Sequence, residues 1–302
     1  IAVRAAGLNF LDTLIIRDLY QRVPDRPFTP GAELSGVIDA VGEGVTRWKA
    51  GDRVACMLHW GALAEYAVVA EDQPVAIPAS LDFASAAGLL LTYGTAIHSL
   101  KDRAALRPGE TLLVLGAGGG AGLAAVDLGK AMGARVIAAV SSEDKARAAR
   151  EAGADDVVLY GRAPFDRDAS RALAGAFKAA CGPGGADVVF DAVGGDYAEP
   201  ALRATAWMGR YLVIGFAAGV PRIPLNLVLL SSRDVRGVVY GEFRDRQPEH
   251  NAGLVAELFD HLAAGRISPR IGATYPFDRA GEALAQLGER KAIGKIVVRI
   301  GD

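Results

Sequence analysis

The chain has 302 residues, of which 51% are hydrophobic and 23% are charged, and its formal net charge is −2 at pH 7. This length predicts two domains, and the apolar share is sufficient for substantial cores. A charge near zero without a run of Lys or Arg excludes a broad basic surface for nucleic acid. Cys56 and Cys181 lie far apart without metal-binding spacing, which is typical of a protein in the reducing cytoplasm.

Neither a membrane span nor a secretory signal is expected. No apolar stretch reaches membrane-spanning length, since the run 225–230 is short and ends at Ser231, Ser232 and Arg233. The N-terminus has no charged segment followed by an apolar one.

The first ninety or so residues contain short apolar segments that are separated by Gly, Pro and Asp turns. Strands are predicted over 31–41, 52–57 and 63–69, with the spacing of an antiparallel barrel rather than of βαβ units. The tail, 266–302, ends in another predicted strand, 294–300, which we expect to return to the first domain.

From residue 112 the pattern changes to strands that alternate with helices. Strands are predicted over 112–116, 135–140, 156–160, 187–191, 211–215 and 235–239, with helices over 122–133, 143–152, 167–181 and 197–205. Short apolar strands separated by helices predict a parallel sheet covered on both faces, and right-handed crossovers make it doubly wound.

The most informative segment is the glycine turn between the first two of these elements. An apolar strand ends at Leu115, Gly116-Ala-Gly-Gly-Gly-Ala-Gly122 follows, and a helix begins there. This arrangement aims backbone N–H groups and a positive helix end at a pyrophosphate. A plain structural turn is the alternative, but the second strand, 135–140, completes a βαβ unit and favours dinucleotide binding.

The end of the second strand bears on which dinucleotide is bound. An Asp or Glu there would accept hydrogen bonds from a ribose 2′-OH, whereas this chain has Ser142 and then Lys145. A hydroxyl and an ammonium suit a 2′-phosphate, so NADPH is favoured over NADH. Alternatively, Ser142 only caps the next helix, with Glu143 and Asp144 favouring its positive end, and both interpretations can hold together.

Segments along the whole chain resemble the zinc-independent quinone oxidoreductase branch of the medium-chain dehydrogenase/reductase superfamily. They are Ala5-Ala-Gly-Leu-Asn-Phe-Leu-Asp12, Pro30-Gly-Ala-Glu-Leu-Ser-Gly36, Val41-Gly-Glu-Gly-Val45, Gly51-Asp-Arg-Val54, the run Gly109–Gly122, Asp191-Ala-Val-Gly-Gly195, Val213-Ile-Gly-Phe216 and Gly294-Lys-Ile-Val-Val298. The resemblance implies an α/β protein with a GroES-like β-barrel catalytic domain, 1–93 and 266–302, around a doubly wound Rossmann NADPH-binding domain, 94–265. It also implies an active site in the cleft between the domains.

The chain departs from the family pattern in places. The family usually has another hairpin before the Ala5–Asp12 segment, so the chain is expected to start late relative to its relatives. Asp127 replaces a Gln that the family tends to have, one turn into a helix.

No metal is expected. In related alcohol dehydrogenases a Cys and the His of a Gly-His-Glu motif bind catalytic zinc, whereas Asn9 and Ala32 stand at these positions here. Without thiolate and imidazole ligands, tetrahedral zinc cannot be assembled at that place. Losing this Lewis acid disfavours alcohol oxidation and leaves hydride transfer to an acceptor that needs little polarisation, such as a quinone or an enone.

The resemblance supplies two candidate catalytic residues. Asn9 matches a position that faces the nicotinamide, and Tyr20 matches a cleft tyrosine whose hydroxyl donates a hydrogen bond or proton. The family often has a second tyrosine where this chain has Leu14, so either Tyr20 acts alone or water supplies the proton. Alternatively, Asn9 is a turn residue that bonds its own backbone and Tyr20 is a packed aromatic.

Twelve residues are candidate NADPH contacts. The pyrophosphate turn supplies Gly119, Gly120, Ala121 and Gly122, and Ser142 and Lys145 face the 2′-phosphate. By resemblance, Tyr160 and Arg290 complete the phosphate clamp and Thr95 lies on the nicotinamide side, although Tyr160 and Arg290 alone would pass for surface polar residues. Gly194, Gly215 and Phe216 end strands along the coenzyme's path, where ligands bind in doubly wound sheets.

The leading hypothesis is an NADPH-dependent quinone or enone reductase that uses a small-molecule substrate. A 2-enoyl thioester reductase, with Asn226 and 227–230 lining a longer acyl pocket, and a non-catalytic NADPH-binding relative are the alternatives. A homodimer is expected, with the strand 235–240 at the edge of the sheet.

Overall fold

The computed structural model describes residues 1–301 and divides the chain into two compact units. The first unit consists of Ile1–Thr92 and the tail from Pro269, and the second of Tyr93–Ser268. Each unit is built on its own six-stranded sheet.

The first unit's sheet has the order β11-β12-β1-β2-β3-β4. Its strands are β1 (Ala2–Leu8), β2 (Glu33–Val37), β3 (Arg53–Met57), β4 (Pro74–Ala76), β11 (Ile271–Pro276) and β12 (Lys295–Arg299). All neighbours are antiparallel except β11 and β12, and β12 from the tail pairs directly with β1. A buried core including Leu34, Cys56 and Val298 holds this sheet to the helices around it.

The helices of the first unit are short. They are α1 (Phe10–Ile15), α2 (Phe83–Ala87), the 3-10 turn η3 (Phe277–Arg279) and α11 (Ala280–Gly288). The helix α3 (Leu90–Ile97) begins in the first unit, whose N-terminal segment ends at Thr92, and continues into the second.

One strand prediction in this unit is wrong. Residues 63–69 form no strand, and their one ladder contact is an isolated bridge between Tyr66 and Ala2. The neighbouring amides of Ala62 and Leu63 instead donate to the carbonyls of Gly31 and Pro30, so the backbone follows a loop. The apolar residues that predicted a strand are split between the core and solvent, since Leu63 is buried and Val68 is fully exposed.

The second unit's sheet has the order β10-β9-β8-β5-β6-β7, and every neighbouring pair is parallel. Its strands are β5 (Thr111–Leu115), β6 (Arg135–Val140), β7 (Asp156–Leu159), β8 (Ala186–Asp191), β9 (Thr205–Val213) and β10 (Asp234–Gly237). This order is that of the doubly wound dinucleotide-binding fold, so the predicted fold class is confirmed.

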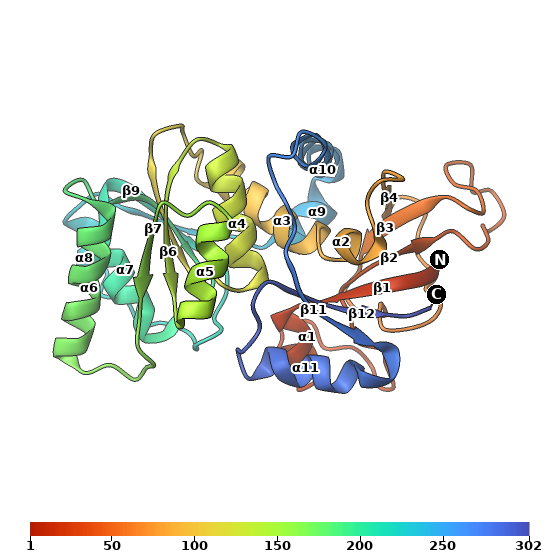
Figure 1. Ribbon diagram of the computed structural model, residues 1–302, viewed down its shortest axis with the longest axis horizontal. Coiled ribbons are helices and arrows are strands. Elements are labelled where there is room, and N and C mark those ends of the chain that lie inside the picture. The colour runs from red at the N-terminus through yellow and green to blue at the C-terminus, as the bar shows by residue number, and fades with distance from the viewer. Residues whose placement is uncertain (302) are drawn as a thin grey trace. The chain divides into compact units, whose positions relative to one another are not determined.

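Helices cover both faces of this sheet. Figure 1 shows α4 (Gly120–Ala131) and α5 (Glu143–Glu151) on one face, with α6 (Arg167–Cys181), α7 (Ala198–Ala204) and α8 (Asn226–Leu229) on the other. The remaining helical segments are η1 (His98–Arg103), η2 (Gly195–Tyr197), α9 (Tyr240–Arg246) and α10 (Pro248–Ala263). Within residues 1–301, no helix has the length and apolar character that crossing a bilayer requires.

One carboxylate joins the two ends of the second unit. Asp127 on α4 accepts hydrogen bonds at Oδ2 from the Tyr93 hydroxyl (2.8 Å) and from the Ser268 backbone N–H (2.7 Å). Tyr93 and Ser268 are the first and last residues of this unit. Burial raises the pKa of Asp127 above its usual value, and these two hydrogen bonds oppose that rise.

Candidate coenzyme site and active site

The glycine turn between β5 and α4 has the features of a phosphate site. The N-cap of α4 is Gly119, and no side chain caps it. The amides of the first helical turn have no acceptor within the helix, so those of Gly120, Ala121 and Gly122 are directed at whatever lies beyond its N-terminus. The predicted pyrophosphate residues therefore lie together at the start of one helix.

Two glycines in this turn are required by geometry. Gly116 has a φ of +70°, a conformation that side chains disfavour. A Cβ on Gly122 would lie 2.1 Å from the Gly116 carbonyl oxygen. The helix can therefore approach the strand end only with glycine at position 122, which is the purpose of the last glycine in a dinucleotide-binding turn.

The predicted 2′-phosphate residues lie beside the same turn. The Ser142 hydroxyl accepts the Lys145 backbone N–H and caps α5, so the capping interpretation of Ser142 is confirmed. The stem of Lys145 covers Gly118, since a Cβ built there would lie 2.5 Å from the Lys145 Cβ, and Nζ donates to the Ser141 hydroxyl. A serine hydroxyl and an ammonium group thus lie next to the glycine turn.

Other predicted contacts follow the carboxyl ends of neighbouring strands. Tyr160 follows β7 and its ring lies 4.8 Å from that of Tyr197. Gly194 follows β8 with a φ of +68°, and a Cβ there would meet the Phe216 side chain at 3.1 Å. Gly215 and Phe216 follow β9, and Phe216 is 42% exposed.

Sequence reasoning missed the residue that organises these loops. Asp191 at the end of β8 is buried, and its Oδ1 accepts the N–H groups of Val193 and Gly194. Its Oδ2 accepts the Tyr211 hydroxyl at 2.6 Å. Burial raises the pKa of the Asp191 carboxyl, and these three hydrogen bonds oppose that rise. The available signal was an acidic residue at a strand end, three positions before a glycine pair.

In the first unit, the Asn9 side chain belongs to a buried polar network. Its Nδ2 donates to Glu33 Oε1 at 2.9 Å, and its Oδ1 accepts from Lys295 Nζ at 2.5 Å. Lys295 also pairs with Glu33, and all three side chains are at most 7% exposed. The other Glu33 oxygen accepts the N–H of Leu91 in the first turn of α3. Both ends of the Asn9 amide therefore have partners in its own unit.

Asp12 adds an acid to this network. Its Oδ2 accepts the Asn9 backbone N–H at 2.7 Å, while its buried Oδ1 has no hydrogen bond of normal geometry. Burial raises the pKa of Asp12 from 3.8 to about 7, against the opposing effects of the Asn9 amide and the Lys295 ammonium. Sequence reasoning missed Glu33 and Lys295 as partners because they are far apart in the chain.

The comparisons with known proteins agree with this geometry. The family pattern described as "Alcohol dehydrogenase GroES-like domain" matches residues 1–79, and "Zinc-binding dehydrogenase" matches residues 120–257. Quinone oxidoreductase-like protein 2 of Bos taurus is 35% identical over 300 residues, which cover 99% of this chain and 84% of the relative. The chain belongs to the quinone oxidoreductase family of the medium-chain dehydrogenase/reductase superfamily.

Solved structures of this family have the same fold. A mycobacterial protein complexed with NADPH superposes with a TM-score of 0.90 at 32% identity, covering 99% of this chain and 90% of that one. The quinone oxidoreductase of Escherichia coli, also complexed with NADPH, gives a TM-score of 0.89 at 29% identity with the same coverage.

The name of one family pattern includes zinc, but the donor set here does not fit it. The side chains around Asn9 are an amide, carboxylates and the Lys295 ammonium, which occupies Asn9 Oδ1 and would repel a metal cation. Zinc sites in proteins need thiolate, imidazole or carboxylate ligands in tetrahedral array. Among the residues that the structure describes, no group of three or more His, Cys, Asp or Glu could hold a metal.

The remaining predicted residues are distributed over the two units. Tyr20 is half-buried in the loop after α1, and Thr95 is half-buried on α3, where its carbonyl accepts the Ser99 hydroxyl. Arg290 is exposed after α11 with a φ of +59°. Tyr20 and Arg290 belong to the first unit and Thr95 to the second.

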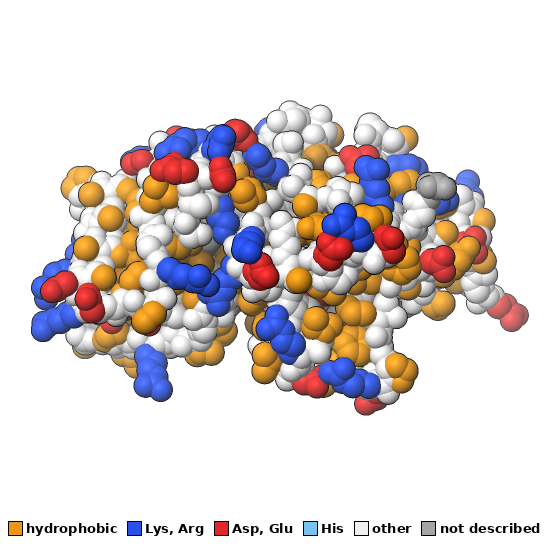
Figure 2. Space-filling view, turned by 60° about the horizontal axis from the view of Figure 1, so that its bottom comes forward, with side chains coloured by type: hydrophobic (Ala, Val, Ile, Leu, Met, Phe, Trp, Pro, Cys, Tyr) orange, Lys and Arg blue, Asp and Glu red, His pale blue; other side chains and the backbone are white. Residues whose placement is uncertain are grey.

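The charged surface is mixed. On the face drawn in Figure 2, Lys and Arg side chains are interspersed with Asp and Glu.

Proposed function

We propose that this chain is an NADPH-dependent oxidoreductase that reduces a quinone or an α,β-unsaturated carbonyl compound without a metal. The observation that carries the proposal is the uncapped glycine turn with Lys145 packed over Gly118. The solved relatives that contain NADPH support the same coenzyme for this chain.

The residues fit NADPH in both parts of the proposed site. Without a Cβ at Gly122, α4 lies close to the end of β5, and its first backbone amides are available to a pyrophosphate. The two residues that directly follow β6 are serines, Ser141 and Ser142. The acids Glu143 and Asp144 come next, on the first turn of α5, and Asp144 is paired with Arg147. A 2′-phosphate would then bind Lys145 Nζ and the hydroxyls of Ser141 or Ser142, with Tyr160 as a further contact from the same unit.

When bound, the coenzyme supplies a hydride. The protein's residues orient the acceptor and stabilise the negative charge that forms on it. The carbonyl oxygen of the acceptor gains negative charge as the hydride arrives at carbon, so a hydrogen-bond donor at that oxygen lowers the barrier. We propose the Tyr20 hydroxyl for this role, with water as the final proton source. Thr95, Gly194, Gly215 and Phe216 would enclose the nicotinamide and limit access of water.

The geometry favours a positioning role for Asn9 over direct contact with the acceptor. Its amide is committed to Glu33 and Lys295, and these buried hydrogen bonds hold it in one orientation. We propose that Asn9 fixes the start of α1 and the Glu33 contact to α3, rather than donating to substrate.

The substitution Lys145→Glu tests the proposal. It places a carboxylate near the 2′-phosphate, so the Michaelis constant for NADPH should rise roughly 100-fold while that for NADH changes little. Lys178→Glu, at an exposed position near the end of α6, is the matched control. An equal loss with both coenzymes would show that Lys145 does not meet the 2′-phosphate.

A panel of acceptors tests the reaction. Stopped-flow oxidation of NADPH should be rapid with a benzoquinone or a short enal. Tight NADPH binding without oxidation by any acceptor would favour a non-catalytic relative, and preference for enoyl thioesters would identify a thioester reductase.

We also propose that the protein forms a homodimer through the second unit. Within residues 1–301 the strand β10 lies at one edge of the parallel sheet, so one side of its backbone has no strand partner there. Large apolar side chains on the neighbouring strand β9 and on α8 are exposed, including Trp207 at 67% and Leu229 at 78%. Pairing of two copies would cover these groups. Val235→Lys should give a monomer by light scattering, whereas an unchanged mass would contradict this interface.

A further inference from the structure

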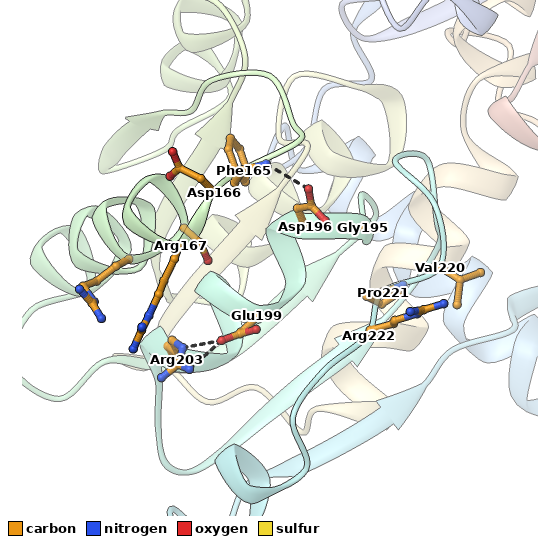
Figure 3. A pocket seen from close by; sticks show the side chains of 12 residues that line it. Phe165, Asp166, Arg167, Gly195, Asp196, Glu199, Arg203, Val220, Pro221 and Arg222 are labelled. Atoms are coloured by element: carbon orange, nitrogen blue, oxygen red, sulfur yellow. Dashed lines mark hydrogen bonds and ion pairs between the residues drawn. The ribbon is translucent and has the colours of Figure 1, made fainter.

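A cavity opens in the second unit, and no residue of the glycine turn lines it. It has a volume of about 680 Å³ and lies between the start of α6, the segment from η2 into α7, and the loop after β9. Figure 3 shows side chains from these three segments around it. None of the candidate coenzyme residues lines this cavity, and its size is that of a small-metabolite site.

Four arginines line the cavity: Arg167, Arg171, Arg203 and Arg222. Arg203 is held by Glu199 through two hydrogen bonds of 2.9 and 2.6 Å. Arg171 Nη1 forms an ion pair with Asp168 Oδ1 at 3.6 Å, too long for a hydrogen bond. Among residues 1–301, the side chains of Arg167 and Arg222 have no hydrogen-bond or ion-pair partner.

The acidic residues of the lining are already used by the protein. Asp166 caps α6 by accepting the Ala169 N–H at 2.8 Å. Asp196 accepts the Phe165 N–H at 3.1 Å, and Glu199 binds Arg203. One oxygen of each aspartate is thus held by a backbone amide, and Glu199 is paired with Arg203. The guanidinium groups of Arg167 and Arg222 remain as unpaired cationic donors, so an anionic ligand suits the cavity.

The arginines are distributed along the cavity. In Figure 3 the Arg167 side chain extends toward the part of α7 that carries Arg203, while Arg222 lies across the view on the loop. Phe165, Val220 and Pro221 supply apolar lining. A ligand that satisfies these groups has several anionic oxygens and a small body, and the planar fork of a guanidinium matches a phosphate group.

We propose that this cavity is a binding site for a small phosphate-bearing metabolite, separate from the coenzyme site. Arg167 and Arg222 are its principal donors, with Arg171 and the Ser170 hydroxyl adjoining them. The proposal does not depend on the identity of the electron acceptor.

Titration calorimetry with inorganic pyrophosphate tests it, on the full chain saturated with NADPH so that the glycine turn is occupied. The double variant Arg167→Gln/Arg222→Gln should weaken pyrophosphate binding about tenfold or more, while NADPH affinity stays unchanged. Arg150→Gln, an exposed arginine near the end of α5, is the matched control and should bind pyrophosphate normally.

Three results would overturn the proposal: no pyrophosphate binding, equal binding by the double variant and the parent, or tighter binding of the tricarboxylate tricarballylate. If NADPH itself fails to bind, the proposed function fails, but the comparison of variants with pyrophosphate still decides the second site. Both arginines are exposed, so their loss should leave the fold intact, which thermal unfolding of each variant verifies.

Discussion

Asp12 should make the first unit less stable as the pH rises. Its pKa is raised from 3.8 to about 7 by burial, so the folded protein holds the proton more tightly than the unfolded chain. The stability that this proton provides is fully present below pH 3.8 and is lost as the pH rises through about 7. At 1.36 kcal/mol per pKa unit, the loss totals about 4 kcal/mol, of which about 3 kcal/mol falls between pH 5 and pH 8.

Asp12→Asn removes this dependence. An amide cannot ionise, and its oxygen can still accept the Asn9 N–H that Asp12 accepts now. The difference in free energy of unfolding, variant minus parent, should therefore increase by about 3 kcal/mol between pH 5 and pH 8.

Urea unfolding followed by tryptophan fluorescence measures the difference. In a Trp207→Phe background the remaining tryptophans, Trp48 and Trp60, both lie in the first unit. Asp25→Asn, at an exposed position in the same unit, is the control. A difference between variant and parent that stays constant with pH, or that shrinks as the pH rises, would refute the reasoning.

Three further substitutions probe the second unit. Gly122→Ala places a methyl group 2.1 Å from the Gly116 carbonyl, so NADPH fluorescence titration should show at least tenfold weaker binding, and unchanged affinity would contradict the phosphate turn. Asp191→Ala leaves the Val193 and Gly194 amides and the Tyr211 hydroxyl without an acceptor, so the free energy of unfolding should fall by about 3 kcal/mol in denaturant titration. Asp127→Ala should accelerate hydrogen exchange of the Ser268 amide at least tenfold, and unaltered protection would show that Oδ2 does not hold it.

The second unit could be predicted from sequence because its signals are local. Each βαβ unit has its apolar strand, turn and helix within about thirty residues, and six predicted strands overlap the observed ones. The glycine turn is likewise contiguous, so its residues could be named together.

The first unit was harder because its contacts are long-range. β1 was not predicted, since Ala2–Leu8 becomes a strand through pairing with β2 and with β12 at the other end of the chain. Residues 63–69 have strand-like composition, but hydrogen bonds to distant parts of the chain hold this segment as a loop. The same reason hid the Glu33–Lys295 pair, whose members are 262 positions apart.

The shared acceptor at Asp127 has an architectural consequence. Because the Tyr93 hydroxyl and the Ser268 amide meet at a single oxygen, the segment 93–268 enters and leaves its fold at neighbouring points. A segment with adjoining termini can be excised, circularised or grafted into a surface loop without stretching its backbone. The second unit, Tyr93–Ser268, is therefore suited to transfer as a whole into another protein.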